Sequence, residues 1–361
     1  MRGLVQAIVI LTVCLIGTTS AQAPKQVMVV QPDVVVKNRA GKKVKVGLAQ
    51  VLTVTIEKDD FLWVPAMKGW APKEDTIALS DAVQFFSASI KEKPTAQAWH
   101  HRGLAWAALG QHEKAIRDFD QAILLESRSV ALRVNRANSY RETKNLDGAI
   151  RDYNRALEVE PRNVQALNNR GLIFSAQEKL DQAMLDFDAA IRIKSDYAEA
   201  HNHRGVVFWK KGKVRDAERN YRRAVKLKPG LPEPYLNLGA VEKSKSNFKE
   251  AVKYYQKALE LNPKFVAANN DLAWILATCS DDSVRDAKAA VKHATLACQL
   301  TQLKNANTID TLAAALAAKG DFKEAVRRIE QAIKISNEES KPQMTLRKNM
   351  YLTKQRFVER N

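Results

Sequence analysis

The sequence predicts a mainly α-helical protein made of stacked helix pairs, with a small all-β domain in front of them. The first observation behind this prediction is a motif that returns every 34 residues between Ala96 and Pro263. A constant period of this length is typical of a solenoid, in which each unit packs on its neighbours. The second observation is a change of periodicity near residue 80, from alternating β-branched residues to apolar residues at helical spacing.

The repeated motif combines small residues with one aromatic residue at constant positions in five successive units. A small residue is followed by an Ala after twelve positions, by the aromatic after sixteen and by another Ala after nineteen. Each unit holds two apolar-periodic segments parted by a turn such as Gly110–Gln111, which predicts a helix-turn-helix pair. The small residues are Gly103, Ala137, Gly171, Gly205 and Gly239, and the aromatic residues are Phe119, Tyr153, Phe187, Tyr221 and Tyr255.

This motif closely resembles that of the tetratricopeptide repeat family. The resemblance implies a right-handed α-solenoid over residues 96–336, with about seven repeats. In repeat six, about five extra residues near 279–283 are expected to delay the second helix to Ala290. In repeat one, the residues that match the family motif are Trp99, Gly103, Trp106, Gly110, Ala115, Phe119 and Ala122.

Both ends of the repeat array are expected to carry a single helix. Residues 81–95 keep only the second half of the motif, with Ala82, Phe86 and Pro94 at its spacing. They are therefore predicted to form one capping helix, because the terminal units of solenoids are usually atypical. Residues 337–361 are predicted to form a C-terminal cap helix that includes Met344, Met350, Leu352 and Phe357.

Residues 24–80 alternate β-branched residues with others in short runs, which predicts five or six strands in a small barrel. The segments 51–56, 61–64 and 68–70 resemble the bacterial SH3-like domain, in which a Trp-containing strand is followed by Gly-Trp at the next turn. The resemblance implies that Trp63 and Trp70 line a groove for a short peptide. The alternative is that both rings fill the interior of a barrel with few other bulky residues.

Residues 1–23 have the layout of an export signal. Arg2 precedes a mostly apolar run, and small residues around Ala21 and Ala23 end the segment. The run is shorter than the roughly 20 residues of a transmembrane helix. We therefore expect export to the periplasm or cell envelope. Because Pro24 hinders cleavage after Ala23, the alternative is an uncleaved signal that anchors the chain to the membrane.

Two charged positions of the repeat change together along the chain. Arg precedes the small residue in the first four repeats, and Asp precedes the aromatic in the first three. Repeat four has Asn220, and repeat five has Leu238 and Tyr254 at the two positions. We therefore expect an Arg–Asp pair between the helices of each of the first three repeats, the alternative being solvated arginines. The residues are Arg102, Arg136, Arg170 and Arg204, with Asp118, Asp152 and Asp186.

The net charge of +18 predicts attraction to acidic partners. Basic residues recur at helical spacing on the second helices of repeats four and five. The family resemblance places second helices on the convex side of the solenoid, away from the groove that the first helices line. This basic stripe is either a solvated face or a contact for an anionic envelope polymer, a lipid or an acidic protein. Nucleic acid is not expected, because no aromatic platform is interleaved with the charges. The basic stripe consists of Arg215, Arg219, Arg222, Lys226, Lys249, Lys253 and Lys257.

The family resemblance implies that the first helices line a groove for partners. Its lining positions combine amide and apolar side chains. Such a surface suits an extended or helical peptide whose backbone is held by Asn side chains. The lining positions are His100, Leu104, Asn138, Arg141, Asn168, Leu172, Asn202, Val206, Trp209, Leu236 and Ala240.

The sequence contains no pattern of catalytic residues, so neither an enzyme nor a cofactor is expected. Neighbouring histidines such as His100 and His101 do not share a helix face, so no metal site is expected. Cys279 and Cys298 are predicted to be free, packed thiols, because they lie towards opposite ends of two antiparallel helices.

Two functions agree with these observations. The first is an exported scaffold that binds peptide or protein partners in the groove of the solenoid. The second is a structural protein of the cell envelope, which grips wall polymer through the SH3-like domain and the basic stripe.

Overall fold

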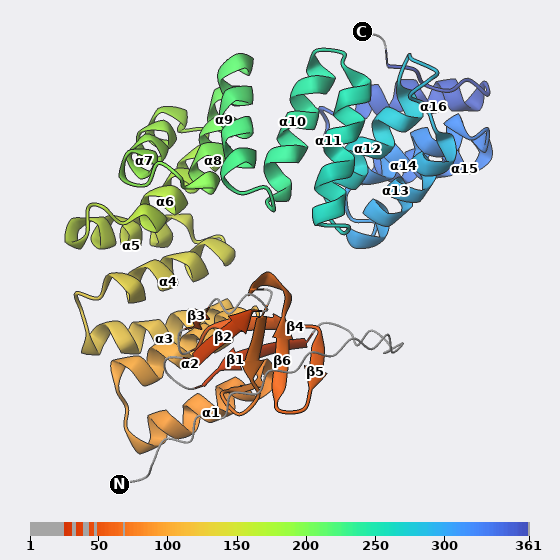
Figure 1. Cartoon of the computed structure of the whole chain (residues 1–361). Helices are drawn as coiled ribbons and strands as arrows, with labels where there is room; N and C mark the ends of the chain where they lie inside the picture. Colours follow the sequence, from red (N-terminus) through yellow and green to blue (C-terminus); the bar gives the residue numbers. More distant parts are fainter. Residues whose placement is uncertain (1–24, 31–33, 39–42, 47–48, 68, 360–361) are drawn as a thin grey trace. The chain divides into compact units, whose positions relative to one another are not determined.

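The structure, a computed structural model, describes residues 25–30, 34–38, 43–46, 49–67 and 69–359. The chain divides into two compact units, residues 1–159 and 160–361. The first unit holds the β region and helices α1 to α5, and the second holds helices α6 to α16 (Figure 1). The predicted order of a small β region followed by a mainly helical array is confirmed.

The β region contains eight strands in its described residues, arranged in two small antiparallel sheets. One sheet has the order β4-β1-β8 and the other β3-β2-β7-β6-β5. Valine and leucine side chains that point inward, such as Val36 and Leu62, form its core. The strands are β1 (Lys25–Val29), β2 (Val34–Asn38), β3 (Lys43–Val46), β4 (Val51–Val54), β5 (Ile56–Lys58), β6 (Phe61–Val64), β7 (Gly69–Pro72) and β8 (Thr76–Ala78).

The expected five or six strands were too few. The Gly-Trp segment, which was expected at a turn, is strand β7, and it pairs with both β2 and β6. Strand β8 pairs with β1. Strands of three or four residues with Gly or Pro carry little side-chain alternation, and backbone pairing defines them instead. The SH3-like assignment of this region stays a prediction.

The helices of the first unit begin where the β region ends. Helix α1 (Leu79–Glu92) packs against β1, β8 and α2. Met28, Phe86 and Ala105 belong to the core that joins these elements. Helices α2 (Ala96–Ala108) and α3 (His112–Leu125) form repeat one, and α4 (Val130–Glu142) and α5 (Leu146–Val159) form repeat two.

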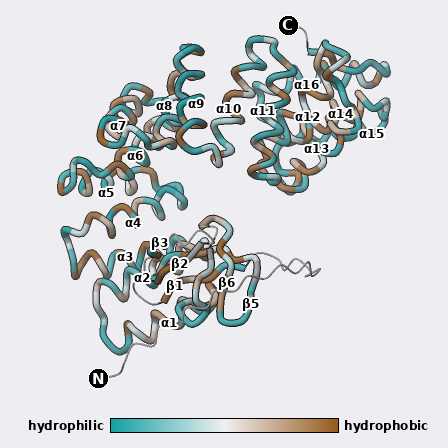
Figure 2. The backbone as a smooth tube through the Cα atoms, viewed as in Figure 1, coloured by the Kyte–Doolittle hydropathy of each residue, from teal (hydrophilic) through white to brown (hydrophobic). Residues whose placement is uncertain are grey.

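The second unit contains five further helix pairs and a last single helix. The pairs are α6 (Val164–Ala176) with α7 (Leu180–Ile193), α8 (Ala198–Lys210) with α9 (Val214–Leu227), α10 (Pro232–Ser244) with α11 (Phe248–Leu261), α12 (Val266–Thr278) with α13 (Ala287–Leu300), and α14 (Ala306–Ala318) with α15 (Phe322–Ile335). Helix α16 (Lys341–Leu352) follows. Hydrophobic and hydrophilic residues alternate along these helices (Figure 2).

The small and aromatic residues of the motif hold the two helices of each repeat together. Phe119, Tyr153, Phe187, Tyr221 and Tyr255 are all at most 2% exposed. A Cβ atom added to Gly239 would lie 2.5 Å from the ring of Tyr255. The absence of a side chain therefore creates the space that the aromatic ring fills.

The turn between the two helices repeats a left-handed residue every 34 positions. Gly110 and Gly212 have φ of 73° and 71°, and Lys144, Glu178 and Ser246 have φ between 57° and 62° at the equivalent positions. Glycine adopts this conformation without the steric cost that a side chain adds. Three of these five turns therefore carry backbone strain.

Repeat six departs from the others as expected. Its helices are joined by the eight residues Cys279–Asp286, whereas three residues join α2 to α3. Both Cys279 and Cys298 are buried free thiols, as predicted.

The C-terminal prediction was partly wrong. Helix α16 ends at Leu352, and Lys354 has a left-handed φ of 55°, which breaks the helix. Phe357 therefore lies on a non-helical tail, residues 353–359, rather than on the cap helix.

Candidate partner-binding surface

The predicted Arg–Asp pairs are present in all three repeats. Each arginine donates two hydrogen bonds, from Nε and Nη2, to the two oxygens of its aspartate, with N···O distances between 2.6 and 2.9 Å. The three aspartates are 3–4% exposed. The hydrogen bonds with Asp152 raise the pKa of Arg136 above its ordinary value. Nε of Arg204 donates to the amide oxygen of Asn220 at 2.9 Å, so repeat four keeps one hydrogen bond of the pair without the second charge.

These arginines also bind the preceding helix pair, which the sequence reasoning missed. Nη1 of Arg136 donates to Asp120 at 2.6 Å, and Nη1 of Arg204 donates to Asp188 at 2.7 Å. Both acceptors lie two residues after a paired aspartate of the preceding repeat. The recurrence of Asp at that position was the available signal.

A second set of hydrogen bonds joins successive first helices. Asn135 bonds His100 at 2.8 Å in the first unit. In the second unit, His203 bonds Asn168 at 2.8 Å and Asn237 bonds Asn202 at 2.9 Å. The partners of each pair are 35 residues apart. We call these contacts the amide ladder.

The amide ladder changes the role expected of two lining positions. Asn168 and Asn202 are 3% and 5% exposed, and their side-chain oxygens accept hydrogen bonds from the next repeat. Their amides are therefore used inside the stack. The signal for this arrangement was the shared position of His101, Asn135, Asn169, His203 and Asn237 within the repeat.

The remaining predicted groove residues are more accessible. His100, Asn138 and Arg141 in the first unit are half-buried. Trp209 and Leu236 in the second unit are also half-buried. Asn138 accepts a hydrogen bond of 2.5 Å from Tyr153, and Arg141 pairs with Glu142 at 2.9 Å. Arg141, Trp209 and Leu236 therefore present side-chain surface that a partner can contact.

The equivalent positions of repeats five and six contact a non-helical segment of the chain itself, residues 353–359. Lys243 on α10 is equivalent to Arg141 and Trp209, and Trp274 on α12 is equivalent to Asn138 and Ala240. Nε1 of Trp274 donates to Oε2 of Glu359 at 2.8 Å. Lys243 lies 3.4 Å from Oε1 of the same carboxylate.

Aromatic and backbone contacts also hold the segment around Glu359 against α12. The ring centroids of Phe357 and Trp274 are 5.8 Å apart. The guanidinium of Arg347 on α16 lies 5.4 Å from both rings. The backbone N–H of Glu359 donates to the carbonyl of Thr278 at 2.8 Å. We refer to Lys243, Trp274 and Thr278 as the tail site.

The basic stripe is largely neutralised by acidic neighbours. All seven side chains lie exposed on α9 and α11, as expected for second helices. Arg222 pairs with Glu218 at 2.7 Å, Lys253 with Glu250 at 2.6 Å and Lys257 with Glu260 at 2.7 Å. Arg219 and Lys249 also lie within 4 Å of carboxylates. Compensated charges attract a polyanion weakly, so grip on an envelope polymer or lipid is not favoured.

Trp63 and Trp70 lie directly opposite each other on β6 and β7. Their rings meet edge to face with centroids 5.2 Å apart, and both are half-buried. Neither ring belongs to the buried core, which Leu62, Val64 and Ala71 reach from these strands. The two rings therefore do not fill the interior of the β region.

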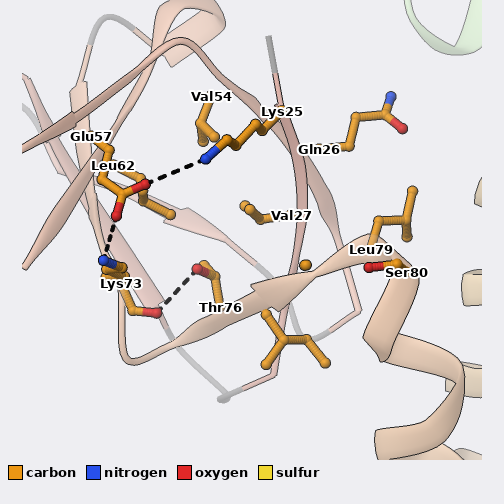
Figure 3. Close-up of a pocket in the computed structure, with 12 residues that line it drawn as sticks. Lys25, Gln26, Val27, Val54, Glu57, Leu62, Lys73, Thr76, Leu79 and Ser80 are labelled. Atoms are coloured by element: carbon orange, nitrogen blue, oxygen red, sulfur yellow. Dashed lines mark hydrogen bonds and ion pairs between the residues drawn. The ribbon is translucent and has the colours of Figure 1, made fainter. Parts of the chain in front are cut away.

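The β region also holds a hollow of about 400 Å³ between its strands and the start of α1 (Figure 3). Glu57 lies between Lys73, to which it is hydrogen-bonded, and Lys25 at 3.8 Å. The hydrogen bond from Lys73 lowers the pKa of Glu57. A carboxylate paired with two ammonium groups is a poor general base.

Among the described residues, no group of three or more His, Cys, Asp or Glu side chains is placed to hold a metal ion. Burial lowers the pKa of His100 to about 4, with a smaller effect from His101. Burial also raises the pKa of the Cys279 and Cys298 thiols, which disfavours reactive thiolates.

Comparison with known proteins identifies the class. Models described as tetratricopeptide repeat match residues 96–129, 198–230, 232–265 and 305–342. A model described as TPR repeat matches residues 137–177 and 171–212. Together these matches cover more than half of the sequence, and the chain belongs to the tetratricopeptide repeat family. Members of this family are typically non-enzymatic scaffolds that bind peptide or protein partners.

Two solved structures show the same fold. A structure of the APC/C hetero-tetramer Cut9–Hcn1 aligns over 75% of this chain and 52% of its own, with 17% identity and a TM-score of 0.61. The structure of yeast Tom70 aligns over 76% of this chain and 59% of its own, with 18% identity and a TM-score of 0.52. The chain thus spans between half and three fifths of these two proteins. None of the curated proteins compared with the chain matches it.

Within the described part of the chain, no helix has both the length and the apolar character needed to cross a bilayer. The predicted signal, residues 1–23, lies outside the described residues.

Proposed function

We propose that this protein is an exported scaffold that binds extended peptide segments of partner proteins on the lining positions of its first helices. The observation that carries this proposal is the tail site, where two residues equivalent to lining positions hold a non-helical segment of the chain itself. A surface that accommodates one extended segment has the shape and hydrogen-bonding groups for another. The family membership supports the same conclusion.

In each compact unit, the half-buried lining positions support this proposal. Arg141 in the first unit, and Trp209 with Leu236 in the second, offer a guanidinium and two apolar side chains. Large side chains such as Trp and Arg commonly dominate binding energy because they bury much area in well-packed, desolvated contacts. The buried Asn168 and Asn202 contribute by holding successive first helices together.

Panning a random peptide library on the full chain tests the binding surface. Selected peptides should bind the Trp209→Ala variant at least about ten-fold more weakly, as for an anchor worth about 1.4 kcal/mol or more. Arg215→Ala is the matched control, because Arg215 is exposed on a second helix. Equal affinities for wild type and Trp209→Ala would contradict the proposed surface in the second unit, and Arg141→Ala tests the first unit in the same way.

Export is tested separately by expressing the full chain in bacteria and identifying its N-terminus. We expect the protein outside the cytoplasm, and a first residue of Gln22 or Pro24 if the signal is removed. An intact Met1 in the membrane fraction would support the tethered alternative. An intact Met1 in the cytoplasm would contradict export.

A further inference from the structure

The tail, residues 353–359, follows helix α16 and contacts the first helices of repeats five and six. It reaches α12 through Trp274 and Thr278, and α10 through Lys243. The indole N–H of Trp274 and the carboxylate of Glu359 are 85 residues apart in the sequence. The tail therefore lies across successive repeats, as a separate extended peptide does when it binds such a surface.

The tail site recognises two features of the segment that it holds. Trp274 and Lys243, on different helices, both direct a nitrogen at the carboxylate of Glu359. Charge-assisted hydrogen bonds of this kind favour an acidic side chain over a neutral one. Phe357, two residues earlier, packs on the Trp274 ring, and the Arg347 guanidinium lies beside both rings. The site is thus complementary to an aromatic residue followed two positions later by an acid.

The tail is held by few contacts compared with the helix that precedes it. Residues 353–356 are exposed and non-helical, and Glu359 makes the one backbone hydrogen bond to α12 among the described residues of the tail. Helix α16 is anchored independently, because Arg347 donates two hydrogen bonds to the buried Asp310 and because Met344 and Tyr351 are buried. Segments with few buried contacts open at low free energy, so the tail can detach while α16 stays in place.

We propose that the tail site binds a segment of a partner protein with an aromatic residue two positions before an acidic residue. The tail occupies this site in cis and lowers the affinity for the partner until it is displaced. The inference rests on the proposed scaffold function, and it adds the chemistry of the ligand and its regulation by the chain itself. The partner belongs to the same class as the tail, a short extended peptide with an aromatic-x-acidic sequence.

The tether makes the tail a strong competitor. A segment joined to its site by a few flexible residues has an effective concentration of about a millimolar. A free peptide of the same sequence must compete with it, and its apparent affinity is reduced by the fraction of molecules in which the site is open. Weakening the tail should therefore strengthen binding of the free peptide.

The probe for the test is a fluorescent peptide with the sequence of residues 353–359 and an amidated end. Its binding is measured by anisotropy to the full chain and to the full-length double variant Phe357→Ala with Glu359→Gln. We expect at least about ten-fold tighter binding to the double variant, since the competing tail is weakened. Adding Trp274→Ala to the double variant should abolish this binding.

Variants of the peptide test the recognised chemistry. Replacing its Phe by Ala, or its Glu by Gln, should weaken binding to the double variant at least about ten-fold. Replacing the Gln that corresponds to Gln355 should have little effect, because this residue is exposed in the structure. Equal binding of all four peptides would overturn the assignment of the ligand.

Two further measurements keep the result decisive. Hydrogen exchange at the Glu359 amide should be faster in the double variant, whereas the amides of α16 should stay protected if the helix remains folded. If α16 stays protected and the peptide binds both chains equally, or neither, the inference is wrong. Dimers of the wild type that disappear in the double variant would also overturn it, because the tail would then belong to a second copy.

The outcome is separable from that of the proposed function. Library peptides that depend on Trp209, together with no binding of the tail peptide to the double variant, would leave the scaffold function standing and reject the tail site. If the library peptides bind independently of Trp209 while the tail peptide still binds the double variant through Trp274, the tail site stands and the proposed surface around Trp209 is rejected.

Discussion

Arg136 and Asp152 lie on the two helices of repeat two and are joined by hydrogen bonds of 2.7 and 2.6 Å in a bidentate arrangement. The carboxylate is 3% exposed, so it depends on this arginine to replace the water that it loses on folding. Arg136 also reaches Asp120 on α3, which links repeat two to repeat one. One side chain therefore stabilises a repeat and its junction with the preceding one.

Substitution of Arg136 by Ala should destabilise the protein by about 3 kcal/mol, because it leaves the buried Asp152 without its bidentate partner. Arg133, 3.7 Å from Asp152, offsets only part of this loss. Urea denaturation followed by circular dichroism measures the change. Arg155→Ala is the control, since its pair with Glu158 is exposed and contributes little to stability.

The double substitution Arg136→Leu with Asp152→Tyr should cost much less than Arg136→Ala alone. It copies repeat five, where Leu238 and Tyr254 occupy the same positions. Removal of both charges avoids an uncompensated buried ion, and apolar replacements of buried pairs are often neutral. An unfolding midpoint of the double variant below that of Arg136→Ala would show that charge pairing is not the main role of this site.

Substitution of Gly239 by Ala should destabilise the second unit by about 1–3 kcal/mol through overpacking. The added methyl would lie 2.5 Å from the Tyr255 ring, which is 1% exposed and enclosed on all sides. Gly230→Ala provides the comparison, because no atom lies within 4 Å of the added methyl. Thermal denaturation of the two variants distinguishes a packing effect from a general effect of replacing glycine.

Substitution of Lys144 by Gly should stabilise the first unit by about 0.5–1 kcal/mol, because glycine relieves a strain of about 1–2 kcal/mol while adding freedom to the unfolded chain. The strain arises because Lys144 has a φ of 62°. Gly212→Ala, at the equivalent turn of repeat four, should have the opposite sign. A lower denaturation midpoint for Lys144→Gly would mean that its side chain contributes more than the strain removes.

The stability of the first unit should fall as the pH is lowered from 6.5 to about 4 because of His100. Burial lowers the pKa of this imidazole to about 4, so the unfolded chain takes up a proton that the folded chain refuses. The contribution of the neutral His100 to the free energy of unfolding is fully present above pH 6.5 and amounts to at most about 3 kcal/mol. His100→Gln should flatten this part of the pH profile, and an NMR titration of the ring that gives a pKa near 6.5 would contradict the prediction.

Features that follow the repeat period could be predicted. The spacing of Gly239 and Tyr255 placed two helices in contact, and the joint change of Arg and Asp between repeats identified a pair that the structure confirms. The extra residues of repeat six lengthened its turn as expected. In both contacts the interacting positions keep a constant separation, so several copies of the same contact were visible in the sequence.

Features of the surface could be predicted only in part. The lining positions stay a prediction from the family pattern, and the burial of Asn168 and Asn202 depends on their bonds to His203 and Asn237 in the next repeat. The basic stripe was located correctly on α9 and α11, yet residues such as Glu218 neutralise it from the same or neighbouring helices. Sequence spacing indicates which face a residue occupies and does not indicate which partner it finds there.

The sequence by itself determined the repeat architecture and its Arg–Asp pairs, because these rest on local contacts repeated at one period. The tertiary structure alone decided where the tail goes. Its contact with Trp274 joins residues 85 positions apart and occurs once, so no repeated pattern in the sequence predicts it. The strand count of the β region was decided in the same way, since pairing of short strands depends on backbone hydrogen bonds between distant segments.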